Sequence, residues 1–99
     1  MEVRFADDKL DRLETDARFT CGYDRDFVRG YRKVLGLIRH AADERDFYGM
    51  TSLHYEKLTD RPGQHSMTPT KKSGLRIVLE FEGRAPKKTV VIVKVEDYH

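Results

Sequence analysis

The sequence has little cysteine and no long apolar run. The one cysteine, Cys21, excludes an internal disulfide and a multi-cysteine metal site, so we expect a protein of the reducing cytoplasm. The absence of a run of about 18 apolar residues predicts no membrane span and no membrane partner. The first residues lack a basic segment followed by an apolar one, so we expect no signal peptide. Without repeats, residues 1–99 are predicted to form a single domain.

The net charge of +2 conceals an uneven distribution. Residues 1–26 carry five Lys or Arg against eight Asp or Glu, whereas the rest of the chain carries fourteen against nine. This basic remainder favours a polyanion or another acidic partner, although an ordinary solvated surface explains the charge equally well.

Two helices are predicted in the first half of the chain. The first begins at Asp7 or Asp8 and ends near Ala17, and the second runs over about residues 24–44. Apolar residues recur at helical spacing in the second helix and predict a buried stripe: Phe27, Tyr31, Val34, Ile38 and Ala41. Its opposite face is basic, with Arg25, Arg29, Arg32, Lys33, Arg39 and His40. That face is either solvated or binds a partner.

Strands are predicted at residues 2–5, 64–68, 75–82 and 89–96, from alternation or from a Val-rich run. The order strand, helix, helix and three strands predicts an α+β fold. The last three strands pair antiparallel because their connections are short, and the two helices pack on one face of the small sheet. The other face stays partly open and is the candidate site.

The strand 89–96 leads into Asp97, Tyr98 and His99, a polar end that a sheet does not require. If Glu82 lies opposite about Thr89, the hairpin places Arg76 opposite about Val95. Arg76 then points to the open face, within reach of the last three residues.

This group of side chains suits RNA cleavage by attack of a ribose 2′-OH on the adjacent phosphate. His99 titrates near neutral pH and can act as acid or base. Arg76 and Lys57 can hold the phosphate, and Tyr98 can stack on a base. His54, His65 and His99 lack a metal-ligand spacing, so no metal is expected. A frayed C-terminal tail is the competing interpretation.

The chain resembles the RelE/ParE superfamily of bacterial toxins, and within it the HigB-type (plasmid-maintenance killer) branch. The matching segments cover nearly the whole chain. They are Glu2–Phe5, Ile38–Ala42, Tyr55–Leu58, Gly63–Met67, Leu75–Ile77 and Glu96–His99, the last ending in Asp-Tyr-His.

The resemblance implies two helices packed on a small sheet, and mRNA cleavage in the ribosomal decoding site without metal or cofactor. It assigns Asp97, Tyr98 and His99 to the catalytic trio and Arg76 to the scissile phosphate, while Lys57 falls in a basic phosphate-binding segment. It also implies a HigA-like helix-turn-helix antitoxin, through which alone the toxin reaches operator DNA.

The sequence departs from that pattern at two places. Glu56 stands where a catalytic His is often found, and His54, two residues earlier, is a candidate RNA-binding residue. Thr68 stands where an Arg is usual, and Lys71 and Lys72 in the longer turn that follows can supply the missing charge. Two alternatives therefore stay open. One is a ParE-like inhibitor of DNA gyrase, and the other is a non-toxic member that still binds its antitoxin.

Overall fold

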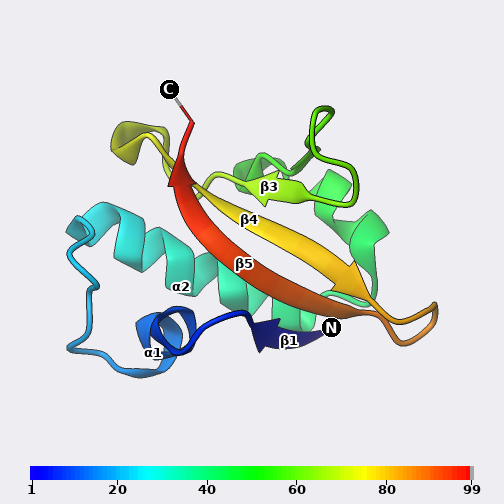
Figure 1. The fold of residues 1–99 in the computed structure, drawn as a ribbon, viewed down its shortest axis with the longest axis horizontal. Helices are drawn as coiled ribbons and strands as arrows, with labels where there is room; N and C mark the ends of the chain where they lie inside the picture. The colour runs from blue at the N-terminus through cyan, green and yellow to red at the C-terminus, as the bar shows by residue number, and fades with distance from the viewer. Residues whose placement is uncertain (99) are drawn as a thin grey trace.

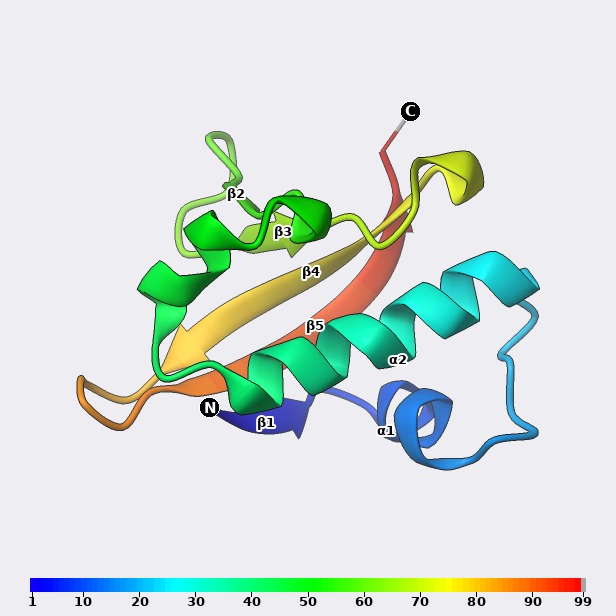
Figure 2. The ribbon, with the colours of Figure 1, turned by 180° about the vertical axis from the view of Figure 1, so that it is seen from behind.

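The computed structural model describes residues 1–98, which form a five-stranded sheet with two α-helices packed on one face (Figures 1 and 2). The elements are β1 (Glu2–Phe5), α1 (Asp8–Thr15), α2 (Arg25–His40), β2 (Glu56–Lys57), β3 (His65–Met67), β4 (Leu75–Glu82) and β5 (Thr89–Asp97). Short 3₁₀ segments are η1 (Glu44–Gly49), η2 (Thr51–Leu53) and η3 (Lys71–Ser73). The predicted α+β arrangement is confirmed.

The strand order is β1-β5-β4-β3-β2, so β5 lies inside the sheet between β1 and β4. β4 pairs antiparallel with β5 and with β3, as predicted, and β3 pairs with the two-residue strand β2. β1 pairs parallel with β5, from Glu2 opposite Thr89 to Phe5 opposite Ile92.

The core lies between α2 and the sheet. Figure 2 shows α2 running diagonally across the face of the sheet, with α1 beside it near the end of β1. The predicted stripe of α2 is buried, and it meets Ile77, Leu79 and Ile92 of the central strands. The helix begins at an Asp24 cap, whose carboxylate accepts the Phe27 N–H, and it ends at His40, four residues earlier than predicted.

Part of the basic face of α2 ties the helices together. The Arg32 guanidinium donates to the carbonyls of Leu13, Asp16 and Phe19, which fixes the end of α1 and the connection after it. Arg39 forms a bidentate ion pair with Glu14 of α1. Within residues 1–98, no helix combines the length and apolarity that a membrane span requires.

Candidate functional site

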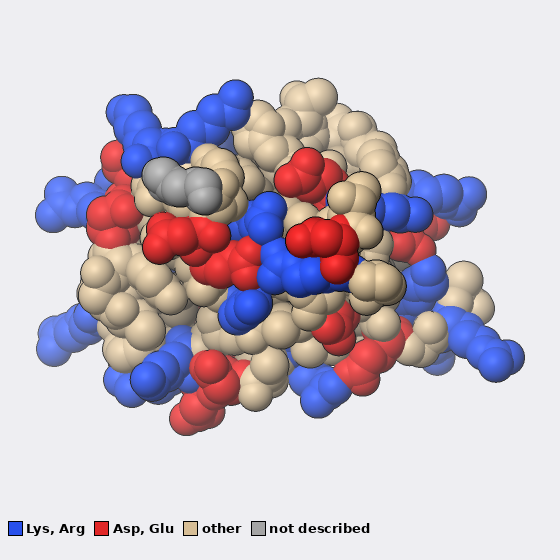
Figure 3. Space-filling view, turned by 45° about the horizontal axis from the view of Figure 1, so that its top comes forward, with Lys and Arg blue, Asp and Glu red and all other residues tan. Residues whose placement is uncertain are grey.

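The face of the sheet away from the helices carries the candidate site. Side chains alternate along β4, so Arg76, Val78 and Glu80 lie on this face while Ile77 and Leu79 enter the core. In Figure 3, Lys and Arg side chains alternate with Asp and Glu side chains across the centre of the surface. The face is therefore charged, and most of its charged side chains lie next to one of opposite sign.

The register of the hairpin differs by one residue from the prediction. Glu82 lies opposite Thr89 as expected, but Arg76 lies opposite Glu96 instead of Val95. The pairing shifts between Val78 and Leu79, where β5 contains one extra residue, Val93. Such a bulge cannot be recognised by counting back from the turn. The predicted proximity of Arg76 to the end of β5 is confirmed, since Leu75 pairs with Asp97.

Arg76 is held by Glu96, its cross-strand neighbour. Its Nε and Nη2 atoms donate to Glu96 Oε2 at 2.9 and 2.7 Å, and its side chain is only 19% exposed. Its Nη1 atom lies 4.0 Å from Glu56 Oε1, on β2. Glu56 also accepts a hydrogen bond from the Ser66 hydroxyl, and its side chain is 62% exposed. A guanidinium and an accessible carboxylate therefore face each other on this surface.

Glu96 binds two further cations. Arg61, in the connection between β2 and β3, donates from Nη1 and Nη2 to both Glu96 oxygens at 2.8 and 2.6 Å. The ammonium of Lys94 lies 3.2 Å from Glu96 Oε1. The hydrogen bond from Arg61, followed by those from Arg76 and Lys94, holds the pKa of Glu96 well below its usual range. Glu96 therefore stays ionised at neutral pH.

The end of β5 lies against η3. The Tyr98 N–H donates to the Gly74 carbonyl at 3.2 Å, and the Tyr98 side chain is partly exposed. This contact places η3 beside the end of β5 (Figures 1 and 2). Lys71 and Lys72 of η3 are both exposed. Asp97 pairs with Leu75 and so points to the face opposite Arg76. His99 lies outside the described residues.

The remaining predicted phosphate ligands do not join Arg76. Lys57 pairs with His65 on β3, and alternation along β2 points it to the helix side of the sheet while Glu56 takes the open side. His54 is exposed at the end of η2. Arg61 and Glu96 were not among the predicted site residues. The only sequence signal for Glu96 was its place next to the Asp-Tyr-His ending, and Arg61 lies in a turn that periodicity cannot place.

His65 is a structural residue in this arrangement. Its ring is buried, stacks on Tyr55 and meets the edge of Phe81, and its Nδ1 atom lies 2.9 Å from the Tyr55 hydroxyl oxygen. Burial lowers the pKa of His65 and thus favours the neutral ring. Residues 1–98 contain no group of three or more His, Cys, Asp or Glu arranged to hold a metal ion.

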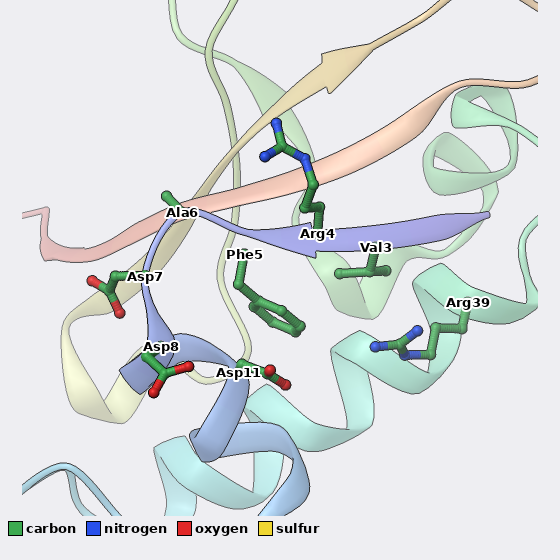
Figure 4. A pocket seen from close by; sticks show the side chains of 8 residues that line it. All are labelled: Val3, Arg4, Phe5, Ala6, Asp7, Asp8, Asp11 and Arg39. Carbon is green, nitrogen blue, oxygen red and sulfur yellow. The ribbon is translucent and has the colours of Figure 1, made fainter.

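A cavity of about 500 Å³ lies elsewhere, beside β1 and the start of α1 (Figure 4). Phe5 and Val3 line it together with Arg39 of α2 and three carboxylates, Asp7, Asp8 and Asp11. Arg4 also lines the cavity, and its guanidinium pairs with Glu82 of β4 (Figure 4). The acidic lining disfavours a phosphate in this cavity.

The fold is similar to that of a solved toxin structure. The structure of a YoeB/ParE toxin from Agrobacterium tumefaciens matches all of this chain and all of its own, with a TM-score of 0.58 and 17% identity. The chain has the YoeB/ParE toxin fold. No family model matches the sequence, and no curated protein matches it. The predicted resemblance to RelE/ParE toxins is therefore confirmed for the fold, and the HigB-type branch stays a prediction.

Within the YoeB/ParE fold of this chain, the candidate residues come from three places. Arg76 and Glu96 belong to the central hairpin, Glu56 to the edge strand β2, and Tyr98 to the segment that leaves the sheet beside η3. These elements meet at one end of the open face. That end is the candidate site.

Proposed function

We propose that this protein is the toxin of a toxin–antitoxin pair and that it cleaves ribosome-bound mRNA. The observation that supports this most is the position of Arg76, whose Nη1 atom faces the exposed carboxylate of Glu56 beside the end of β5. A cation for the phosphate and a proton acceptor for the 2′-OH are the two groups that phosphodiester transfer within RNA requires.

The proposed reaction is an attack within the RNA strand. The ribose 2′-oxygen attacks the adjacent phosphorus while the bond from phosphorus to the 5′-oxygen of the next nucleotide breaks. Glu56 accepts the 2′-OH proton, and His99 donates a proton to the leaving 5′-oxygen. Arg76 binds the phosphate oxygens, on which negative charge increases in the transition state. The products are a 2′,3′-cyclic phosphate and a 5′-hydroxyl end.

Glu56 refines the role expected for this position. It replaces a His in the HigB-type pattern. Like that His, a carboxylate beside the phosphate-binding guanidinium can accept the 2′-OH proton. Tyr98 stacks on a base of the mRNA, while Lys71 and Lys72 of η3 contribute positive charge near it. Asp97 then acts by positioning the end of β5.

The partners follow from the same proposal. An antitoxin of the helix-turn-helix, HigA-like kind neutralises the protein, and operator DNA is contacted through that antitoxin. The ribosome presents the mRNA, and the exposed cations of this surface meet its RNA. The protein acts in the cytoplasm, where ribosomes are.

The test compares induced expression of the wild type with His99→Ala, Arg76→Gln and Glu56→Gln in a bacterial host, with mRNA ends mapped by primer extension. We expect wild-type growth arrest with cleaved mRNA, and loss of both in His99→Ala. The removal of one proton-transfer group lowers the cleavage rate on isolated ribosomes about 100-fold or more. Arg84→Gln is the matched control, because Arg84 is exposed beyond the far end of the hairpin.

Each alternative gives a different result. A His99→Ala variant that arrests growth as strongly as the wild type contradicts the nuclease mechanism. DNA-damage signalling without mRNA cleavage indicates a gyrase inhibitor. Absence of toxicity with retained antitoxin binding indicates a non-toxic relative.

A further inference from the structure

We propose that Arg61 is a second phosphate-binding residue of this site. In this role it holds the RNA phosphate next to the scissile one, and Glu96 positions its guanidinium. The inference rests on the proposed function and extends it, because it concerns how the RNA is bound outside the scissile phosphate. No sequence pattern pointed to Arg61, which the structure places on the same carboxylate as Arg76.

The two arginines bind Glu96 through different edges of their guanidinium groups. Arg61 binds end-on, because it donates from Nη1 and Nη2 to the two carboxylate oxygens. Arg76 binds side-on, because it donates from Nε and Nη2 to Oε2 alone. A guanidinium carries five N–H donors in one plane, so neither ion pair uses all of them.

The unused donors form a second edge on each arginine. For Arg61 this edge consists of the Nε–H and an adjacent Nη–H. For Arg76 it consists of the N–H groups of Nη1 and Nη2 at the end of the guanidinium, where Nη1 also lies 4.0 Å from Glu56 Oε1. Such an edge binds a phosphate through two parallel hydrogen bonds. Two guanidiniums on one carboxylate thus offer two adjacent anion sites, which suits consecutive phosphates of an RNA strand.

Among the ion pairs around Glu96, three cations face two carboxylates. Arg61, Arg76 and Lys94 contact Glu96, and Glu56 lies 4.0 Å from Arg76. The side chains of Arg61 and Glu96 are 29% and 18% exposed, so their field is screened less than that of a free surface pair.

Arg61 is also held in position by its own backbone. Its N–H donates to the Leu58 carbonyl, and its carbonyl accepts from the Gln64 N–H. Gly63 between them has a φ of +81°, a conformation that glycine adopts without strain. The guanidinium is therefore presented by a fixed turn and does not have to be ordered when RNA binds.

The experiment uses full-length protein and ribosomes programmed with short synthetic mRNAs that contain one ribonucleotide, at the cleavage site, and 2′-O-methyl nucleotides elsewhere. One mRNA has normal linkages. In two others, a neutral methylphosphonate replaces the phosphate on the 5′ or the 3′ side of the scissile one. Single-turnover cleavage rates are measured for the wild type, Arg61→Gln and Arg45→Gln. Arg45 is the matched control, since it forms an exposed ion pair with Asp43 away from this site.

We expect one neutral linkage to slow the wild type and the Arg45→Gln variant by about tenfold to a hundredfold, the effect of one charge-assisted contact. Arg61→Gln should cleave normal mRNA at that reduced rate. Its cleavage rate should not fall further when the neutral linkage replaces the phosphate. The ratio of rates within one variant does not depend on how much protein is folded.

Two results overturn the proposal. If Arg61→Gln remains as sensitive to both neutral linkages as the wild type, Arg61 does not contact a neighbouring phosphate. In that case wild-type cleavage still supports the proposed function. If the wild type cleaves none of the mRNAs, the proposed function fails together with this extension.

Discussion

At the scale of single residues, the geometry of the candidate site depends on Glu96. Its carboxylate lies across the strand from Arg76 and receives Arg61 from a turn that is distant in sequence, so it joins three segments of the chain. A half-buried carboxylate that accepts several charge-assisted hydrogen bonds stabilises the fold as well as the site. The Glu96 carboxylate therefore contributes both to the stability of the fold and to the geometry of the candidate site.

We predict that Glu96→Gln destabilises the fold by about 1–3 kcal/mol at pH 7, because the neutral amide leaves three cations near each other. The pKa of Glu96 is lowered in the folded state by its cation partners. Its contribution is therefore complete above the unfolded pKa of about 4.3 and is lost as the pH falls below it.

Urea unfolding of the wild type and Glu96→Gln between pH 7 and pH 3 measures this contribution. The difference between the two proteins should shrink as the pH falls below about 4. A difference that stays constant over this range would show that the ionised carboxylate is not its source. Glu82→Gln serves as control, because Glu82 forms a single, exposed pair with Arg4.

At the scale of elements, the packing of α2 against the segment before η3 fixes the end of the sheet that carries the site. Gly30 of α2 faces Pro69, and a Cβ at Gly30 would lie 2.7 Å from the Pro69 Cβ. A Cβ at Gly36, six residues further along the helix, would have no atom within 4 Å. Packing against Pro69 therefore requires a glycine at position 30, whereas no contact requires one at position 36.

We predict opposite effects of the two alanine substitutions. Gly36→Ala should stabilise the fold by about 0.5–1 kcal/mol, because alanine loses less backbone entropy in a helix. Gly30→Ala should destabilise it by about 1–2 kcal/mol in spite of the same gain, because Pro69 is rigid and must move. Thermal unfolding of both variants tests this, and equal shifts in Tm would show that α2 does not bear on Pro69.

Local signals predicted the elements better than the contacts between them. The strand at 75–82 and the helix that begins after Asp24 follow from alternation, periodicity and a cap, which are properties of neighbouring residues. The parallel pairing of β1 with β5 joins segments more than 80 residues apart, and the bulge at Val93 leaves no mark in the sequence. Arg76 was predicted correctly for the open face. Its pairing with Glu96 depends on that bulge, and the approach of Arg61 to the same carboxylate depends on a turn.

At the scale of the whole molecule, the sheet depends on its last strand. β5 forms hydrogen bonds with β1 on one side and with β4 on the other, and it contributes Val90 and Ile92 to the core. Without it, β1 has no strand partner among residues 1–88 and the largest strand interface of the sheet is missing. The fold is therefore expected to be all-or-none.

We predict that a fragment of residues 1–88 is unfolded, with the far-UV circular dichroism of a disordered chain and no cooperative transition on heating. A peptide of residues 89–99 added in excess should restore structure in a concentration-dependent way, because it completes the sheet. A cooperative transition in the fragment alone would show that the helices and β2–β4 form an independent core.

The internal position of β5 also has a consequence for biosynthesis. A ribosome makes residues 1–88 before any part of β5 exists, so the growing chain emerges without the strand that unites its two ends. Glu96 arrives last among the residues that hold Arg61 and Arg76 together. The three segments that carry Arg61, Arg76 and Glu96 therefore cannot join until β5 has been synthesised, so the candidate site does not assemble on a chain that still lacks this strand.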